Sequence, residues 1–168
     1  MLPLWRPAYV ALGSNLNQPR AQVLEAFERL ASVRDTRLEL RSSLYLTHPM
    51  GPQDQPDFVN AAAGLLTQLD ARDLLGELLG IERAMGRNRK ERWGPRIVDL
   101  DLLWMFGAPI DDSNLTLPHP GVSERNFVLY PLSEIAPTLL IPGHGRVASL
   151  KSRVNSDGIS VLQYRGFG

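Results

Sequence analysis

The sequence predicts an α+β fold, in which a largely antiparallel β-sheet has helices packed on one of its faces. Segments with strand and with helix periodicity follow one another in the order strand, helix, strand, strand, helix, strand. Both helical segments carry a single apolar stripe that can be buried against a sheet. This order of elements is that of a ferredoxin-like sandwich.

The first part of the chain supplies a strand, a helix and a second strand. Residues Tyr9–Leu12 form a short apolar run that predicts a buried strand, and residues 13–15 (Gly-Ser-Asn) predict the turn that ends it. A helix follows, with Pro19 in its first turn. The apolar residues that recur at helical spacing are Val23, Phe27 and Leu30. Residues Leu38–Leu46 predict the second strand.

A proline-rich loop separates this strand from the next. Residues Thr47–Pro56 contain three prolines and a glycine, which exclude a regular strand or helix, and such loops often shape pockets. Residues Phe58–Leu69 then predict a strand. The small residues at 61–64 (Ala-Ala-Ala-Gly) are equally compatible with a helix.

The second helix has clear signals at both ends. Asp70 is placed to cap its N-terminus and Gly86 to close its C-terminus. Its buried stripe consists of Leu74, Leu78, Ile81 and Met85. Residues Arg87–Arg96 contain a Gly-Pro pair and predict irregular structure, and Ile97–Phe106 has the composition of a strand.

The C-terminal part is less clearly patterned. A helix is predicted over Phe127–Ile135 and a weak strand over Ile159–Tyr164. With no repeat and no linker, one domain over residues 1–168 is expected. Within it, residues 1–8 form a short N-terminal extension, and residues 143–168 form a tail whose structure the sequence specifies weakly.

The composition narrows the class of protein. Hydrophobic residues make up 43% and charged residues 21%, as in ordinary globular proteins, and no apolar run approaches the roughly 18 residues of a membrane span. The absence of cysteine excludes a disulfide framework, an iron–sulfur cluster, a thiolate zinc site and a cysteine nucleophile. The N-terminal residues lack the apolar stretch of a signal peptide, so a cytoplasmic protein is expected.

Charge is balanced over the chain but concentrated in one segment. Basic and acidic residues number 18 each, which gives no overall field to hold a nucleic acid or an anionic membrane. Between Arg83 and Arg96, however, Glu91 is the single acidic residue. The basic residues there are Arg83, Arg87, Arg89, Lys90, Arg92 and Arg96. Guanidinium groups bind phosphate oxygens in pairs, so this segment predicts a phosphate contact; the alternative is a solvated basic loop.

Two aspartates follow this basic segment at a spacing that suits a metal ion. Asp99 and Asp101 are two residues apart on a predicted strand and therefore share a face, with Cα atoms about 6.5 Å apart. Mg²⁺ prefers one or two carboxylates together with substrate phosphates. The sequence therefore predicts a site for a metal-bound polyphosphate, and the alternative is a solvent-exposed strand face.

Other familiar signals of nucleotide chemistry are missing. Neither a G-x-x-x-x-G-K-[ST] nor a G-x-G-x-x-G pattern occurs. His119 lies between two prolines and His48 lies beside Pro49, which suits contact residues more than mobile acid–base groups, and surface packing explains them equally well. A hydroxyl nucleophile on the substrate would require none from the protein.

Four stretches taken together resemble one known family. They are YVALGSNL, THPMGPQDQPDFVNA, GRNRKERWGPRIVDLDLL, and LTLPHP with RNFVLYPLSEIAP. They are similar to the 6-hydroxymethyl-7,8-dihydropterin pyrophosphokinases of the bacterial folate pathway, from Tyr9 to Pro137. The central motif R-W-G-P-R-x-x-D-L-D joins two rare clusters at a fixed spacing, which makes the resemblance specific.

The resemblance implies a ferredoxin-like fold and a defined reaction. The pyrophosphoryl group of ATP is transferred to the hydroxymethyl group of the dihydropterin, which leaves AMP. The implied partners are these two small molecules, with no nucleic acid and no membrane, and a monomer is expected. The implied cofactor is a pair of Mg²⁺ ions held by Asp99 and Asp101.

The resemblance also assigns residues to each substrate. Arg87, Arg96, Asp99 and Asp101 form the catalytic set, and residues 87–96 correspond to a mobile catalytic loop. The pterin contacts are Thr47, Pro49, Met50, Phe58, Asn60, Trp93 and Phe127. The ATP contacts are Leu75, Glu82, Arg87, Arg89, Trp93, Arg96, Leu102, Thr116, His119 and Arg125. Phe58 and Phe127 would sandwich the pterin and Asn60 would read its polar edge, whereas core burial is the ordinary role of phenylalanine.

The chain departs from the family pattern at several positions. Leu79 stands where glutamine is frequent, Pro120 where an aromatic residue can occur and Asn114 where an arginine can occur. The catalytic loop is one residue shorter. His48 and Phe58 replace proline and tyrosine in the pterin pocket.

Two other functions remain compatible with the residues. An RNA-binding module could stack bases on aromatic side chains and hold phosphates with the basic loop, but neutral net charge and the aspartate pair oppose it. A metal-dependent phosphohydrolase would differ by consuming ATP without any pterin.

Overall fold

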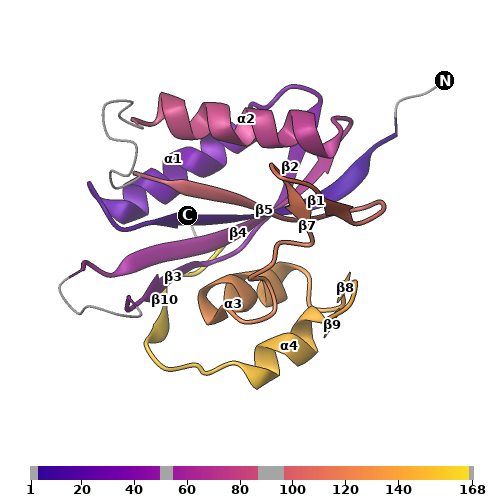
Figure 1. Cartoon of the computed structure of the whole chain (residues 1–168). Helices are drawn as coiled ribbons and strands as arrows, with labels where there is room; N and C mark the ends of the chain where they lie inside the picture. The colour runs from indigo at the N-terminus through magenta and orange to yellow at the C-terminus, as the bar shows by residue number, and fades with distance from the viewer. Residues whose placement is uncertain (1–3, 50–54, 87–96, 167–168) are drawn as a thin grey trace.

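A six-stranded antiparallel sheet organises the computed structural model, which describes residues 4–49, 55–86 and 97–166 (Figure 1). Its strands are β1 (Arg6–Ser14), β2 (Thr36–Arg41), β3 (Leu44–Thr47), β4 (Phe58–Thr67), β5 (Asp99–Met105) and β10 (Ile159–Gln163). The strand order is β10-β3-β4-β1-β5, with β2 also paired to β4. The first and last strands of the predicted pattern, β1 and β5, are neighbours, and this split arrangement confirms the ferredoxin-like topology.

Helices cover both faces of this sheet, so the expectation that one face is covered was wrong. In Figure 1, α1 (Pro19–Ala31) and α2 (Ala71–Ala84) lie on one side, and α3 (Asn126–Ile135) and α4 (Val147–Arg153) lie on the other. Each pair of helices encloses its own apolar cluster. The central strand β4 explains why the prediction failed. Its alanines are buried on both faces, so its sequence lacks the alternation of polar and apolar residues that indicates a solvated face.

The C-terminal tail belongs to the main structure. It forms α4, which the sequence pattern did not indicate, and then β10, which pairs with β3 at one edge of the sheet. Two small hairpins, which were also not predicted, complete the described residues. They are β6 (Ile110–Asp111) with β7 (Thr116–Leu117), and β8 (Leu140–Ile141) with β9 (Gly145–Arg146).

The strand predicted over Leu38–Leu46 is interrupted at Ser42 and Ser43, so that β2 and β3 lie one after the other along the same edge of β4. Ser42 explains why pairing continues across the break. Its backbone N–H donates to the carbonyl of Ala62 at 2.9 Å, and its hydroxyl accepts from the backbone N–H of Ala62 at 2.8 Å. A side-chain oxygen thus replaces a backbone carbonyl, which no propensity pattern reveals.

A second interaction anchors the break to α3. The carboxylate of Glu134 accepts from the backbone N–H and the hydroxyl of Ser43, and from the hydroxyl of Tyr45 at 2.7 Å. Arg165 pairs with the same carboxylate at 3.0 Å. Burial, together with the bond to Glu134, raises the pKa of Tyr45 well above its usual range. The C-terminal half of α3 is therefore fixed to β3.

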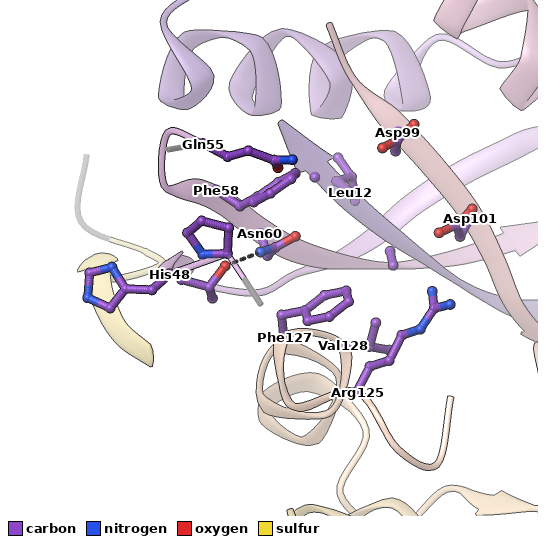
Figure 2. Close-up of a pocket in the computed structure, with 14 residues that line it drawn as sticks. Leu12, His48, Gln55, Phe58, Asn60, Asp99, Asp101, Arg125, Phe127 and Val128 are labelled. Atoms are coloured by element: carbon purple, nitrogen blue, oxygen red, sulfur yellow. Dashed lines mark hydrogen bonds between the residues drawn. The ribbon is translucent and has the colours of Figure 1, made fainter. Parts of the chain in front are cut away.

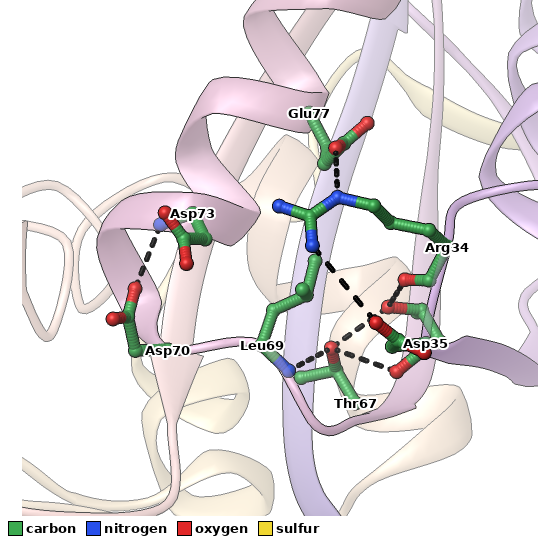
Figure 3. A network of polar contacts seen from close by, with 8 residues as sticks. Arg34, Asp35, Thr67, Leu69, Asp70, Asp73 and Glu77 are labelled. Carbon is green, nitrogen blue, oxygen red and sulfur yellow. Dashed lines mark hydrogen bonds and ion pairs between the residues drawn. The ribbon is translucent and has the colours of Figure 1, made fainter.

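Most local signals behave as predicted. Residues 61–64 lie within β4, so the helical alternative is wrong there. Pro19 begins α1, and Asp70 caps α2 by accepting from the backbone N–H of Asp73 at 2.8 Å (Figure 3). Gly86 has a φ of +107°, and a Cβ there would lie 2.7 Å from the Cδ1 atom of Ile97. This helix end requires a residue without a side chain.

The loop before β2 is tied to β4 and α2 through the polar contacts drawn in Figure 3. Arg34 donates to Glu77 of α2 at 2.8 Å, and the hydroxyl of Thr67 in β4 donates to the backbone carbonyl of Asp35 at 3.5 Å. β4 ends at Thr67, two residues before the predicted boundary at Leu69. Among the described residues, no helix has the length and apolar character that crossing a membrane requires.

Candidate active site

A pocket of about 350 Å³ lies on the α3 face of the sheet (Figure 2). It is bounded by β1, β4 and β5, by the residues that follow β3, and by the start of α3. The predicted site residues that line it are Thr47, Pro49, Phe58, Asn60, Asp99, Asp101, Arg125 and Phe127. The fold thus brings together residues from both predicted substrate sides, which lie up to 80 positions apart in the sequence.

The floor of the pocket is the end of β1. Gly13 is paired with Asn60 of β4 on one side and with Asp99 of β5 on the other. Ala11 is likewise paired with Asp101. Because glycine and alanine are the smallest residues, β1 leaves space between the side chains of the flanking strands β4 and β5.

Gly13 lies inside β1, so the prediction of a turn at residues 13–15 was wrong for its first two positions. Its role depends on the missing side chain, because a Cβ there would lie 2.7 Å from the Oδ1 atom of Asn60. Glycine in a strand often marks such a close approach. The side-chain amide of Asn60 needs this space.

Asn60 is held in a single orientation. It is 7% exposed, and its amide donates to the hydroxyl of Thr47 at 2.7 Å, the bond drawn in Figure 2. Thr47 is itself buried at the end of β3. A buried amide fixed in this way is suited to recognising the polar edge of a flat heterocycle.

Two phenylalanines form opposite walls. Phe58 begins β4 and Phe127 is the second residue of α3, and Figure 2 shows their rings on either side of the opening. Both are half-buried, unlike the core residue Phe27, which is 1% exposed. Exposed ring faces of this kind suit stacking on a planar ligand, which a core ring does not.

The carboxylates of Asp99 and Asp101 lie on the same face of β5, as the spacing predicts. Leu100 and Leu102 alternate with them and are each only 4% exposed in the core under α1 and α2. Two half-buried carboxylates on a pocket wall match the donor set that Mg²⁺ accepts when substrate phosphates complete its coordination. These residues therefore fit the implied metal.

His119 and Arg125 lie near this acidic side. Burial lowers the pKa of His119, the charge of Arg125 lowers it further and the charge of Asp101 opposes the shift. The Nδ1 atom of His119 accepts from the backbone N–H of Gly121 at 3.0 Å, so the neutral ring carries its proton on Nε2. Arg125 extends over Gly121, where a Cβ would lie 2.5 Å from its Nε atom.

Other residues predicted on the ATP side do not line this pocket. Glu82 is buried on α2 and accepts from the backbone N–H of Leu100 at 2.9 Å. Leu102 belongs to the core and Leu75 packs against it, while Thr116 is in β7. Their nucleotide contacts stay predictions. The predicted residues Met50, Arg87, Arg89, Trp93 and Arg96 lie outside the described residues.

Sequence reasoning did not identify several residues of the pocket. They are Ala11, Leu12, Gly13, Gln55 and Val128, whereas His48 lines the pocket as the resemblance implies. The alternation of Ala11 and Gly13 in β1 was the available signal, since small residues on one strand face mark a close approach. His48 pairs with Asp57 at 2.8 Å, a contact between two strand ends that the intervening loop hides in the sequence.

The chain matches the family model described as 7,8-dihydro-6-hydroxymethylpterin-pyrophosphokinase (HPPK) over residues 9–137. It is similar to the 2-amino-4-hydroxy-6-hydroxymethyldihydropteridine pyrophosphokinase of Pseudomonas aeruginosa, with 46% identity over 92% of this chain and 95% of the relative. The protein of the same name from Methylorubrum extorquens is 45% identical over 93% of this chain and 98% of the relative.

Solved structures resemble the fold. A crystal structure of Plasmodium falciparum HPPK-DHPS with pteroate has a TM-score of 0.71 and 13% sequence identity. The match covers 89% of this chain and 44% of that chain, so the present chain corresponds to less than half of the Plasmodium protein. At this identity the likeness concerns the fold alone.

Proposed function

Because the chain belongs to the 7,8-dihydro-6-hydroxymethylpterin-pyrophosphokinase family, we propose that the pocket described above is its active site. The enzyme transfers a pyrophosphoryl group from ATP to the hydroxymethyl group of 6-hydroxymethyl-7,8-dihydropterin, a step of folate biosynthesis. One observation carries the assignment of the site: an aromatic pair and a carboxylate pair line the same 350 Å³ pocket.

The aromatic side of the pocket is the proposed pterin site. The heterocycle lies between Phe58 and Phe127, and Asn60 hydrogen-bonds its polar edge from the floor. Thr47 supports this role because it accepts one amide proton of Asn60 and so fixes which atoms the amide presents. Backbone groups at Thr47, Pro49 and Met50 complete the pterin contacts, with Trp93 contributing from the catalytic loop.

The carboxylate side is the proposed site of phosphate transfer. Asp99 and Asp101 would hold two Mg²⁺ ions, which when bound supply positive charge to neutralise the phosphates. Arg125 and His119 are proposed to contact the nucleotide near Asp101. This placement is supported by the charges of Arg125 and Asp101, which both shift the pKa of His119. The other ATP contacts proposed are Leu75, Glu82, Arg87, Arg89, Trp93, Arg96, Leu102 and Thr116, with Arg87 and Arg96 as catalytic residues.

The chemistry requires little covalent participation by the protein. The hydroxymethyl oxygen attacks the β-phosphorus of ATP, its proton passes to water, and the bond from the β-phosphorus to the α-phosphate oxygen breaks to release AMP. The substrate supplies the nucleophile, so the side chains act by positioning two substrates and stabilising charge. We also propose that the enzyme works as a monomer in the cytoplasm, where ATP is available.

The products provide a direct test of the reaction at this site. Protein incubated with ATP, Mg²⁺ and the hydroxymethyl-dihydropterin should yield AMP and the pterin diphosphate in equal amounts, measured by phosphorus NMR. ADP as the main nucleotide product would indicate attack at the γ-phosphorus. Loss of ATP at the same rate without pterin would indicate a phosphohydrolase instead.

Substitution of Gly13 tests the proposed pterin floor. In Gly13→Ala the new Cβ would lie 2.7 Å from the Oδ1 atom of Asn60, so the amide must move. We expect pterin affinity to fall about 10- to 100-fold, as for a lost buried hydrogen bond, with ATP affinity within about twofold. Isothermal titration with each ligand measures both.

Gly64→Ala is the matched control. It makes the same change in the adjacent strand, where the Cβ crowds Leu40 and lies outside the pocket. Equal losses of pterin affinity in the two variants would show that general strain in the sheet, and not displacement of Asn60, is responsible.

A further inference from the structure

The C-terminal segment between α4 and β10 connects the two walls of the pocket. In Figure 1 this part of the chain runs from α4, below the sheet, to the sheet edge beside β3. We propose that this segment, residues 154–158, acts as a brace that sets the separation of the walls carrying Phe58 and Phe127. Asn126, which contacts the brace, is then a positioning residue for the pterin. The proposal rests on the assignment of this pocket to the pterin.

One end of the brace holds the wall that carries Phe127. Asn126 is the first residue of α3, and its side-chain amide donates to the backbone carbonyl of Asn155 at 2.8 Å. The side chain of the N-cap residue, Arg125, makes no capping hydrogen bond at this terminus. The bond from Asn126 is therefore a direct polar connection between the start of α3 and the rest of the fold.

The other end of the brace holds the opposite wall. The backbone N–H of His48 donates to the carbonyl of Gly158 at 3.0 Å, and Ile159 is paired with Thr47 in the sheet. Thr47 is in turn paired with Phe58. Gly158 has a φ of +75°, and a Cβ there would lie 3.2 Å from the His48 ring, so the backbone lies directly against it.

The turn between these ends is itself fixed. The side-chain oxygen of Asn155 accepts from the backbone N–H of Asp157 at 2.8 Å, and the carbonyl of Ser156 accepts from the backbone N–H of Ile159 at 3.3 Å. Two such bonds fix the backbone conformation of the turn, so the positions of its two ends are coupled. Phe127 and Phe58 are thus linked through a short ordered segment that lies outside the pocket.

The brace completes the anchoring of α3. Glu134 fixes the C-terminal half of the helix to Ser43 and Tyr45 at the start of β3, as described above. Asn126 fixes the N-terminal end, through the tail, to the end of β3. Loss of the second attachment removes the polar restraint on the end that carries Phe127, and stacking on both faces of a ligand is sensitive to its separation from Phe58.

The test compares three variants with the wild-type enzyme, and Phe127→Ala serves as a separate check on the pocket. Asn126→Ala removes the bond to Asn155, and Asn126→Gln keeps an amide donor on a longer side chain. Arg146→Ala is the matched control, because it removes a similar side-chain bond of 3.0 Å to a backbone carbonyl, that of Thr138, in the β8–β9 hairpin. Pterin and ATP affinities are measured by titration, and thermal unfolding is recorded for each variant.

We expect Asn126→Ala to weaken pterin binding about tenfold, to leave ATP affinity within about twofold, and to be partly restored by Asn126→Gln. Arg146→Ala should change stability similarly but neither affinity. If Asn126→Ala and Arg146→Ala have the same pterin affinity, the brace proposal is overturned. If Phe127→Ala also binds pterin normally, the assignment of this pocket to the pterin fails. That outcome is distinguishable from failure of the brace proposal alone, in which Phe127→Ala still weakens pterin binding.

Discussion

Replacing Asp101 or Asp99 with asparagine is expected to lower turnover by about three orders of magnitude or more while the enzyme still folds. The substitution removes a negative charge and almost no volume. Both side chains are half-buried on the pocket face of β5, and neither belongs to the apolar cluster beneath it. The loss should therefore appear in catalysis and Mg²⁺ dependence, with the fold retained.

Steady-state assays over a range of Mg²⁺ concentrations measure this effect, with circular dichroism to check folding. Asp111→Asn is the control, because Asp111 is an exposed aspartate in β6 outside the pocket. It should retain normal turnover. Near-normal activity of both Asp99→Asn and Asp101→Asn at saturating Mg²⁺ would contradict the assignment of these residues as metal ligands.

Removal of either aromatic wall is expected to weaken pterin binding strongly. Stacking contributes roughly 1 to 3 kcal/mol per ring, so Phe58→Ala or Phe127→Ala should raise the pterin dissociation constant about 10- to 100-fold. ATP affinity should change much less, because the nucleotide side is formed by other residues. Calorimetric titration with each ligand separates the two effects.

Two further phenylalanines distinguish stacking from other consequences of the change. Phe106 is 55% exposed outside the pocket, so Phe106→Ala should alter neither affinity. Phe27 is 1% exposed in the core, so Phe27→Ala should destabilise the fold by about 3 to 5 kcal/mol. If Phe58→Ala or Phe127→Ala weakens both ligands equally and behaves like Phe27→Ala in unfolding, the rings are core residues and not a substrate stack.

Elements with strong local signals were correctly predicted. The second helix has a capping aspartate at Asp70 and a required glycine at Gly86, and both signals act within one turn of the chain. The shared face of Asp99 and Asp101 follows from strand geometry in the same way, because alternate residues of any strand point to one side. The resemblance in the central motif then connected this pair to a reaction.

Elements stabilised by distant parts of the chain were not predicted correctly. The break at Ser42 depends on a hydroxyl that accepts from Ala62, 20 residues away. The tail joins the sheet because β10 pairs with the edge of β3, although the strand pattern of residues 159–163 is weak. The second helical layer, α3 and α4, was not predicted because the alanines of β4 are buried on both faces of the sheet. Their sequence therefore shows no alternation that distinguishes a covered face from a solvated one.

The sequence by itself determined the order of the main strands and helices, the ends of the second helix, the aspartate pair and the family, because capping, periodicity and motif spacing are properties of neighbouring residues. Only the tertiary structure decided that Gly13 is part of the pocket floor, that Asn60 fits against it, and that the tail holds Thr47 and Asn126 in place. These features depend on the register of strands and the docking of helices. The energies that select them come from contacts between residues far apart in the chain, which local patterns do not encode.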